Sequence, residues 1–286
     1  MGSIVLNFDA AKDNIIDNGY PIMQSYRMKG CVYVPTGFIG KTLFSSSSPC
    51  MDVADILTLQ HSGWEIGTHS NSHPNFIMVS KKRIEAEVVE SIKYLKHIGI
   101  NEISSISYPG DGISKKGIKI VEKYLKIGTM SNGISNNYNF NNFLNLTIKR
   151  NFICEKTFNE KRIKEYLTFL KGYKGFGVFS FHDIVSKPKY IDNDLSIDKF
   201  KKIIEMIDEL NLPVKTFQDL QEEKVPFSER NFVPEMLMTI GSEGKRCYNS
   251  YIMGYVIYFI YKIEGIRKIL TKWYYNKKIS RINTDI

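Results

Sequence analysis

Cysteine is scarce in this chain of 286 residues, and the few cysteines lie far apart. They are Cys31, Cys50, Cys154 and Cys247, and no two have the C-x-x-C spacing. Because a disulfide framework and a cysteine-based zinc site both need clustered cysteines, the sequence excludes both kinds of site. We expect four reduced thiols.

The chain also lacks a long apolar run. Its most apolar segment, residues 251–261, has eleven uncharged residues, whereas a helix that spans a bilayer needs ~20. Lysine and arginine are interleaved in the residues that follow. Two interpretations stay open: an interfacial amphipathic helix that gives peripheral membrane contact through residues 248–280, or a C-terminal helix packed on the folded domain.

Positive charge is in excess, but it is unevenly placed. The formal net charge is +9, and residues 245–286 carry +7 of it. A nucleic-acid-binding domain more often spreads basic charge over its folded face, so we expect no nucleic-acid partner. No signal peptide is visible at the N-terminus, and we expect a cytoplasmic location or one peripheral to the membrane. The oligomeric state is left open by the sequence.

Strand-like and helix-like segments alternate along the first 220 residues. We predict strands at residues 4–8, 31–35, 64–69, 103–109, 175–182 and 212–217. We predict helices at residues 20–29, 52–61, 80–99, 115–126, 159–171 and 196–210, and loops at 44–49 and 132–145. Repeated β–α units with short links predict an α/β fold with a parallel sheet, either open or closed into a barrel.

Polar side chains follow several of these strands directly. Asp9 ends the first strand, His69 ends the third, and His182 ends a later strand that reads as buried. Because carboxyl ends of parallel strands meet at one edge, we expect these side chains to share a site. His73 follows His69 by four residues, a spacing that allows two imidazoles to bind one metal. Asp9 could be a general base, a metal ligand or a helix cap.

Five segments taken together resemble a known family. They are IVLNFDAAKDNIIDNGYPIMQSYRMKGCVYVPTGFIG, GWEIGTHSNSHPNF, SYPGDG, VFSFHDI and LPVKTFQDL. They look like the successive motifs of polysaccharide deacetylases of the NodB-homology type, carbohydrate esterase family 4. The resemblance implies an incomplete, distorted (β/α) barrel that removes N-acetyl, or sometimes O-acetyl, groups from acetylated glycans. It also implies a divalent metal, Zn²⁺ in the first place, with Co²⁺ or Ni²⁺ as alternatives.

The resemblance assigns roles to the first two motifs residue by residue. Asp9 stands at the general-base position of the family motif T-F-D-D-G. Ala10 stands where the family has a metal-ligating aspartate. His69 and His73 match the metal motif H-S-x-x-H, so the usual third ligand is missing from its place.

The later motifs are matched less completely. Pro109 is present, and Gly110 follows it at the position whose backbone N–H stabilises the oxyanion. Ser107 stands where many members have an arginine that orients the base. His182 matches the general acid.

Three functions remain open at this point. The first is a metal-dependent deacetylase in which waters, Asp9 or Asp111 complete the metal shell. The second is a degenerate barrel that binds glycans with weak or no catalysis, and the third is a membrane-surface scaffold that acts through the basic tail. We predict a catalytic domain at residues 1–221 and a C-terminal extension at residues 222–286.

Overall fold

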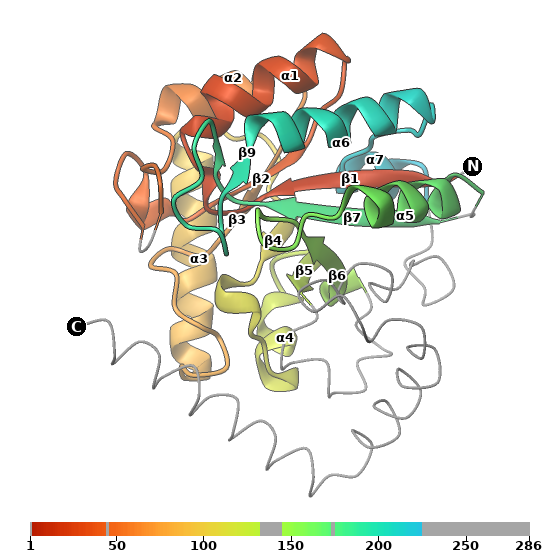
Figure 1. The fold of residues 1–286 in the computed structure, drawn as a ribbon. Helices are drawn as coiled ribbons and strands as arrows, with labels where there is room; N and C mark the ends of the chain where they lie inside the picture. Colours follow the sequence, from red (N-terminus) through yellow and green to blue (C-terminus); the bar gives the residue numbers. More distant parts are fainter. Residues whose placement is uncertain (1, 44–45, 132–144, 173–174, 225–286) are drawn as a thin grey trace, which may run out of the picture.

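The computed structural model describes residues 2–43, 46–131, 145–172 and 175–224, and these residues form a closed barrel of seven parallel strands (Figure 1). The strands follow one another in chain order, and β1 closes the barrel by pairing with β7. They are β1 (Ser3–Phe8), β2 (Cys31–Val34), β3 (Glu65–Thr68), β4 (Ser105–Ser107), β5 (Ile127–Ser131), β6 (Ile148–Phe152) and β7 (Phe176–Phe181). A small separate sheet pairs β8 (Ile184–Val185) with β9 (Leu195–Ser196).

Helices cover the outside of this barrel, with α1, α2 and α6 on one side and α3 on another (Figure 1). They are α1 (Tyr20–Ser25), α2 (Val53–His61), α3 (Lys81–His97), α4 (Lys115–Val121), α5 (Glu160–Gly172), α6 (Ile197–Glu209) and α7 (Phe217–Glu222). The predicted cap of α3 is confirmed, because the Ser80 hydroxyl accepts a hydrogen bond from the Arg83 N–H.

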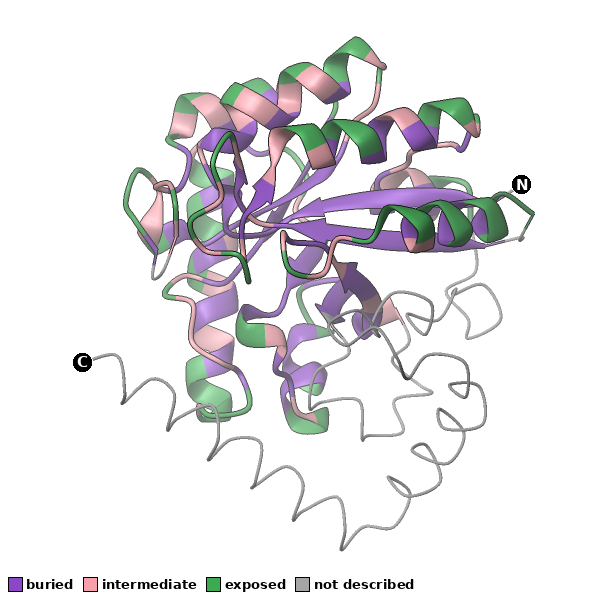
Figure 2. Ribbon diagram, viewed as in Figure 1, coloured by how far each residue is buried: buried purple, intermediate pink, exposed green. Residues whose placement is uncertain are grey.

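The barrel strands are buried on both faces (Figure 2). Every residue of β1 and β7 is buried, because interior side chains fill the barrel and helices cover its outside. Phe8 and Phe181 are register partners at the ends of these strands, and both rings pack on Phe200 of α6. This packing places the residues that follow the two strands, Asp9 and His182, at the same rim.

The predicted α/β barrel is confirmed, but two details were wrong. The predicted closing strand at residues 212–217 forms only a single bridge, between Val214 and Ile4, and β7 closes the barrel instead. Strands β5 and β6 were not predicted. The barrel has seven strands in the described residues, one fewer than a complete (β/α)₈ barrel.

Most of the predicted C-terminal extension, from residue 225 onward, lies outside the described residues. The domain boundary at residue 221 and the membrane contact through residues 248–280 therefore stay predictions. In the described part of the chain, every helix is too short or too polar to cross a bilayer.

Candidate active site

One pocket of about 220 Å³ opens at the carboxyl ends of the strands. It is smaller than the ~300 Å³ at which pockets for drug-sized ligands begin, so it suits a small group together with water. The residues predicted from the motifs converge there: the lining includes Asp9, Ala10, His69, His73, Gly110 and His182. Pro109 is buried just outside the lining. Lining residues that the motifs did not single out include Lys12, Tyr108, Arg150, Asp183 and Asn193.

Strained backbone is concentrated around this pocket. Positive φ values occur at Ala10 (59°), Ser70 (65°), His73 (58°) and Asp111 (54°), none of which is glycine. Such conformations cost of order 1–3 kcal/mol each and persist where the surrounding structure holds them. Three strand-end loops therefore keep their shape at a cost in stability, as is common at functional sites.

Asp9 is buried in a network with a single arginine. Arg150 forms ion pairs with the carboxylates of Asp9 and Asp111, the latter at 2.7 Å. It also donates a hydrogen bond of 2.9 Å to the Ser107 hydroxyl. Burial opposes ionisation of Asp9, but Arg150, assisted by His69 and His182, outweighs it and lowers the pKa of Asp9 to about 2. Asp9 is therefore ionised at neutral pH, the form that accepts a proton.

Arg150 is the functional residue that sequence reasoning missed. It lies on β6, outside every quoted motif, in the polar segment Ile-Lys-Arg-Asn-Phe that does not read as a strand. Its guanidinium reaches Ser107, the position where the resemblance led us to expect an arginine. The guanidinium that pairs with Asp9 thus comes from a different strand, β6.

The two histidines of the third strand end face each other. Their Nε2 atoms are 3.1 Å apart, and the backbone carbonyl of Ser107 lies 2.7 Å from the Nδ1 atom of His69. A carbonyl oxygen only accepts, so His69 carries its proton on Nδ1 and turns the Nε2 lone pair toward His73. Burial lowers the pKa of His69 to about 4 and that of His73 to about 3, so both imidazoles are neutral at pH 7.

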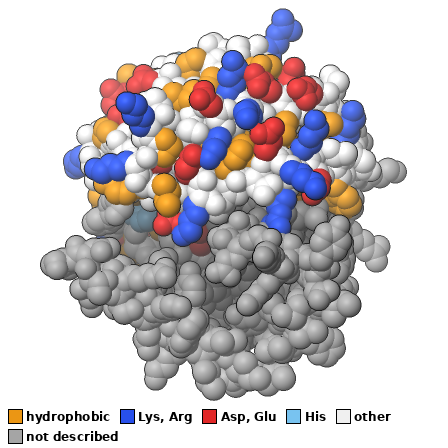
Figure 3. All heavy atoms as spheres, in the orientation of Figure 1, with side chains coloured by type: hydrophobic (Ala, Val, Ile, Leu, Met, Phe, Trp, Pro, Cys, Tyr) orange, Lys and Arg blue, Asp and Glu red, His pale blue; other side chains and the backbone are white. Residues whose placement is uncertain are grey.

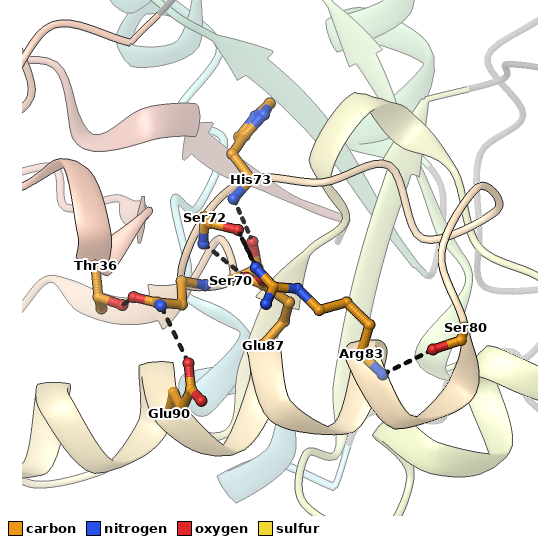
Figure 4. A network of polar contacts seen from close by, with 9 residues as sticks. Thr36, Ser70, Ser72, His73, Ser80, Arg83, Glu87 and Glu90 are labelled. Atoms are coloured by element: carbon orange, nitrogen blue, oxygen red, sulfur yellow. Dashed lines mark hydrogen bonds and ion pairs between the residues drawn. The ribbon is translucent and has the colours of Figure 1, made fainter.

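The loop between these histidines is tied to α3 by a buried carboxylate (Figure 4). Glu87, only 1% exposed, accepts hydrogen bonds from the backbone N–H groups of Asn71 and Ser72 and from the Ser72 hydroxyl. Arg83 forms a 2.6 Å ion pair with Glu87. The Ser70 hydroxyl accepts from the His73 N–H, which holds the second histidine in its left-handed conformation.

For the zinc site that the resemblance implies at His69 and His73, we expect Glu87→Gln to weaken zinc binding by roughly 10-fold or more, the usual cost of losing a group that orients metal ligands. The amide NH2 group of the new glutamine is a donor, so it cannot accept the hydrogen bonds from the two loop N–H groups that the Glu87 carboxylate now accepts. Glu90→Gln is a matched control, because Glu90 accepts one exposed hydrogen bond from the Asn71 side chain. Titration calorimetry with zinc on chelator-treated protein measures the zinc affinity of both variants. An equal loss of zinc affinity in the two variants would contradict the role of Glu87.

His182 stands opposite the histidine pair. Its Nε2 atom lies 3.9 Å from the Oδ2 atom of Asp9, and its ring contacts Phe152 edge-on at a centroid distance of 4.8 Å. Burial lowers the pKa of His182 although Asp9 opposes this. The imidazole is therefore neutral at neutral pH.

The family model for polysaccharide deacetylase matches residues 1–125, which include Asp9, the histidine pair and Gly110. The match covers less than half of the chain, and it shows that these residues are similar to the polysaccharide deacetylase family. A poly-beta-1,6-N-acetyl-D-glucosamine N-deacetylase of Staphylococcus aureus (strain MRSA252) is 23% identical over 130 residues. That match covers 42% of this chain and 44% of the relative, so the chain spans less than half the length of the curated relatives it matches.

Solved structures share the fold of this barrel. A family 4 acetyl xylan esterase from Clostridium thermocellum, in complex with a cobalt ion, has a TM-score of 0.52 and 15% identity over 80% of this chain and 96% of that chain. A CE4 family pseudoenzyme from Bacillus anthracis has a TM-score of 0.50 and 13% identity over 77% and 65%. At these identities the likeness concerns the fold alone.

His69 and His73 fit two corners of a metal site. Two zinc–nitrogen bonds of ~2.0–2.1 Å at a tetrahedral angle place the nitrogens about 3.3 Å apart, close to the observed 3.1 Å. A third protein ligand is not supplied by the described residues, among which no cluster of three His, Cys, Asp or Glu residues forms. Asp9 and Asp111, which the sequence left open as substitutes, are both engaged by Arg150.

The buried His69 should make the metal-free protein sensitive to acid. Its pKa falls from 6.5 to about 4 on folding, so between these values the unfolded state binds a proton that the folded state does not. Stability is complete above pH 6.5 and decreases toward pH 4, by about 3 kcal/mol for this side chain. Urea unfolding at pH 7.0 and 4.5 measures the loss. In His69→Asn the free energy of unfolding should depend less on pH. An unchanged pH dependence would contradict the assignment of this acid sensitivity to His69.

The visible face of the described chain has charges of both signs. Figure 3 shows lysine and arginine side chains interspersed with aspartate and glutamate there, without a broad basic area on that face. This agrees with a sequence whose basic excess lies mainly in residues 245–286.

Proposed function

We propose that this chain hydrolyses N-acetyl groups on a polysaccharide or oligosaccharide that contains N-acetylhexosamine. The observation that carries the proposal is the convergence of Asp9, His69, His73 and His182 on one small pocket. These four side chains come from three strand ends that are distant in sequence. An ionised carboxylate, two neutral imidazoles whose Nε2 atoms face each other and a third imidazole form a set suited to amide hydrolysis.

In the proposed reaction each residue acts on a proton or a developing charge. Asp9, kept ionised and oriented by Arg150, takes a proton from the attacking water. Gly110 lines the pocket, and its backbone N–H would stabilise the oxyanion. His182 takes up a proton and delivers it to the leaving amine. His69 and His73 would hold a divalent metal, which when bound polarises the acyl oxygen and lowers the pKa of water.

The substrate class rests on two arguments. The pocket has room for an acetamido group and water but not for a whole sugar chain, so the glycan must lie across its mouth. The named activity of the Staphylococcus aureus relative is N-deacetylation of a β-1,6-linked N-acetylglucosamine polymer. We therefore propose N-acetylglucosamine oligomers as the first substrates to test, with an O-acetylated xylan as the alternative.

The deciding experiment is mass spectrometry of N-acetylglucosamine oligomers after incubation with the full chain, with and without added Zn²⁺ or Co²⁺. We expect a loss of one acetyl mass per event. Asp9→Asn should remove this activity, by roughly 10²–10⁴-fold for a lost general base, while zinc remains bound. If zinc is lost as well, Asp9 is a metal ligand in place of the residue at position 10. Absence of release from every acetylated substrate would refute the proposal.

Ala10 favours a second candidate, a barrel that binds glycans without turning them over. Catalytic zinc sites usually have three protein ligands, and the described residues provide two. This candidate predicts that acetylated oligomers bind at the pocket, weakened by His69→Asn, while no metal supports acetate release. The retention of Asp9, His182 and both histidines is the reason for placing catalysis first.

A further inference from the structure

Lys12 is a buried lysine in the wall of the pocket. It directly follows the short 3₁₀ turn Asp9–Ala11, and it is only 2% exposed. Its backbone is fixed by a bridge to Cys50, and its side chain lines the pocket together with His73 and Asp183. Lysine is almost never fully buried unless it is paired, so this position calls for an explanation.

The Lys12 ammonium has no partner among the described residues. Its Nζ atom is buried with no hydrogen-bond acceptor in reach, and a buried unpaired charge costs several kcal/mol. The carboxylates of the pocket lining make contacts with other groups, although Asp9 keeps one oxygen, Oδ1, without a hydrogen-bond partner among the described residues. Asp9 and Asp111 pair with Arg150, and Asp183 accepts hydrogen bonds from Asn14, Ser46 and Ser48.

Lys12 is therefore a cation of the pocket lining without a hydrogen-bond acceptor among the described residues, and a ligand oxygen that carries negative charge would supply one. Hydrolysis of an acetamide creates such a charge at one place. The water oxygen attacks the acyl carbon, and the π pair of the C=O bond moves onto its oxygen. The C–N bond then breaks with its electron pair on nitrogen, both water protons end on that nitrogen, and acetate leaves. The substrate is neutral, whereas the intermediate and the product are anionic at the acyl oxygens.

We infer that the Lys12 ammonium binds the acyl oxygen as it becomes an oxyanion, and then binds the carboxylate of the released acetate. This inference rests on the proposed function and makes Lys12 a catalytic residue of the reaction. A cation that pairs with charge present only in the intermediate and product lowers the barrier more than it aids substrate binding. Lys12 would also supply positive charge to a site with only two histidine ligands.

Binding of the product tests the inference without turnover. The probes are acetate and its neutral isostere acetamide, titrated into the full chain by calorimetry. Lys12→Met keeps the length of the apolar stem and removes the charge, and Lys12→Arg keeps the charge. We expect Lys12→Met to weaken acetate binding at least 10-fold, on the order of one lost charge-assisted hydrogen bond. The affinity for acetamide should stay within 3-fold of the parent chain. Lys12→Arg should have an acetate affinity between those of the other two proteins. Lys82→Met, on the exposed face of α3, is the control.

Steady-state kinetics test the role of Lys12 in a second way. Lys12→Met should lower kcat by roughly 10²–10³-fold, the usual effect of removing one oxyanion donor, with KM changed less than 3-fold. Because the variant removes an unpaired buried charge, its urea midpoint should stay the same or rise, whereas a merely structural lysine would lower it. Should Lys12→Met fail to fold, Lys12→Gln replaces it.

The possible outcomes separate the two ideas. Equal acetate affinity in the parent chain and Lys12→Met, or equal kcat, overturns the inference and leaves the deacetylase proposal standing. A parent chain that releases no acetate but binds it through Lys12 refutes the deacetylase proposal and supports the anion site. Loss of acetamide binding together with acetate binding would show that Lys12 shapes the pocket, and it would overturn the inference.

Discussion

Replacement of Arg150 by Met is expected to lower the free energy of unfolding by about 3–5 kcal/mol, since it leaves a buried carboxylate without its partner. Arg150 is 3% exposed and Asp9 is 1% exposed, so solvent cannot take over the role of the guanidinium. Without Arg150, burial would raise the pKa of Asp9 above its present value of about 2. The base would then be badly placed, and acetate release should fall by roughly 10²-fold or more, as for a misplaced catalytic group.

Two further variants make this prediction specific. Arg150→Lys keeps one charge but cannot pair with Asp9 and Asp111 together, so it should recover only part of the stability. The double variant Ser107→Arg with Arg150→Ser moves the guanidinium to the strand where the sequence resemblance led us to expect it. Urea unfolding and acetate release measure all three proteins. If Arg150→Met is as active and as stable as the parent chain, the ion pairs of Arg150 with Asp9 and Asp111 contribute to neither activity nor stability.

Substitution of Ala10 by Asp is expected to tighten zinc binding by roughly 100-fold or more, because it adds the third protein ligand that zinc sites usually have. Ala10 lines the pocket with His69 and His73 and is 2% exposed. Its backbone is already left-handed, with φ 59° and ψ 13°. Aspartate and asparagine tolerate this conformation better than most other residues, so the substitution should not strain the turn.

Ala10→Asn is the matched control for this gain. It has the same backbone preference and nearly the same shape, but it lacks the carboxylate, so its zinc affinity should stay within a few-fold of the parent. Competition against a fluorescent chelator measures the dissociation constants without any need for turnover. A folded Ala10→Asp protein with unchanged zinc affinity would contradict the placement of position 10 beside the two histidines.

The chemistry of the site could be predicted where a side chain directly follows a strand with an apolar pattern. Asp9, His69 and His182 were placed at one rim because parallel strands share a direction, and the structure places all three there. The left-handed turn at Ala10 could not be anticipated, because alanine has no preference for that conformation. The short strands β5 and β6 were missed because polar residues interrupt their pattern.

The sequence by itself determined the alternation of strands and helices, the rim on which the chemistry lies, and the absence of an aspartate at position 10. Only the tertiary structure decided which distant groups compensate one another. Arg150 meets Asp9 across 141 positions of chain because barrel closure leaves only β7 between β6 and β1. Among the residues that the structure describes, Lys12 has no hydrogen-bond partner for the same reason: charge pairing depends on distances and burial in space, which no local pattern records.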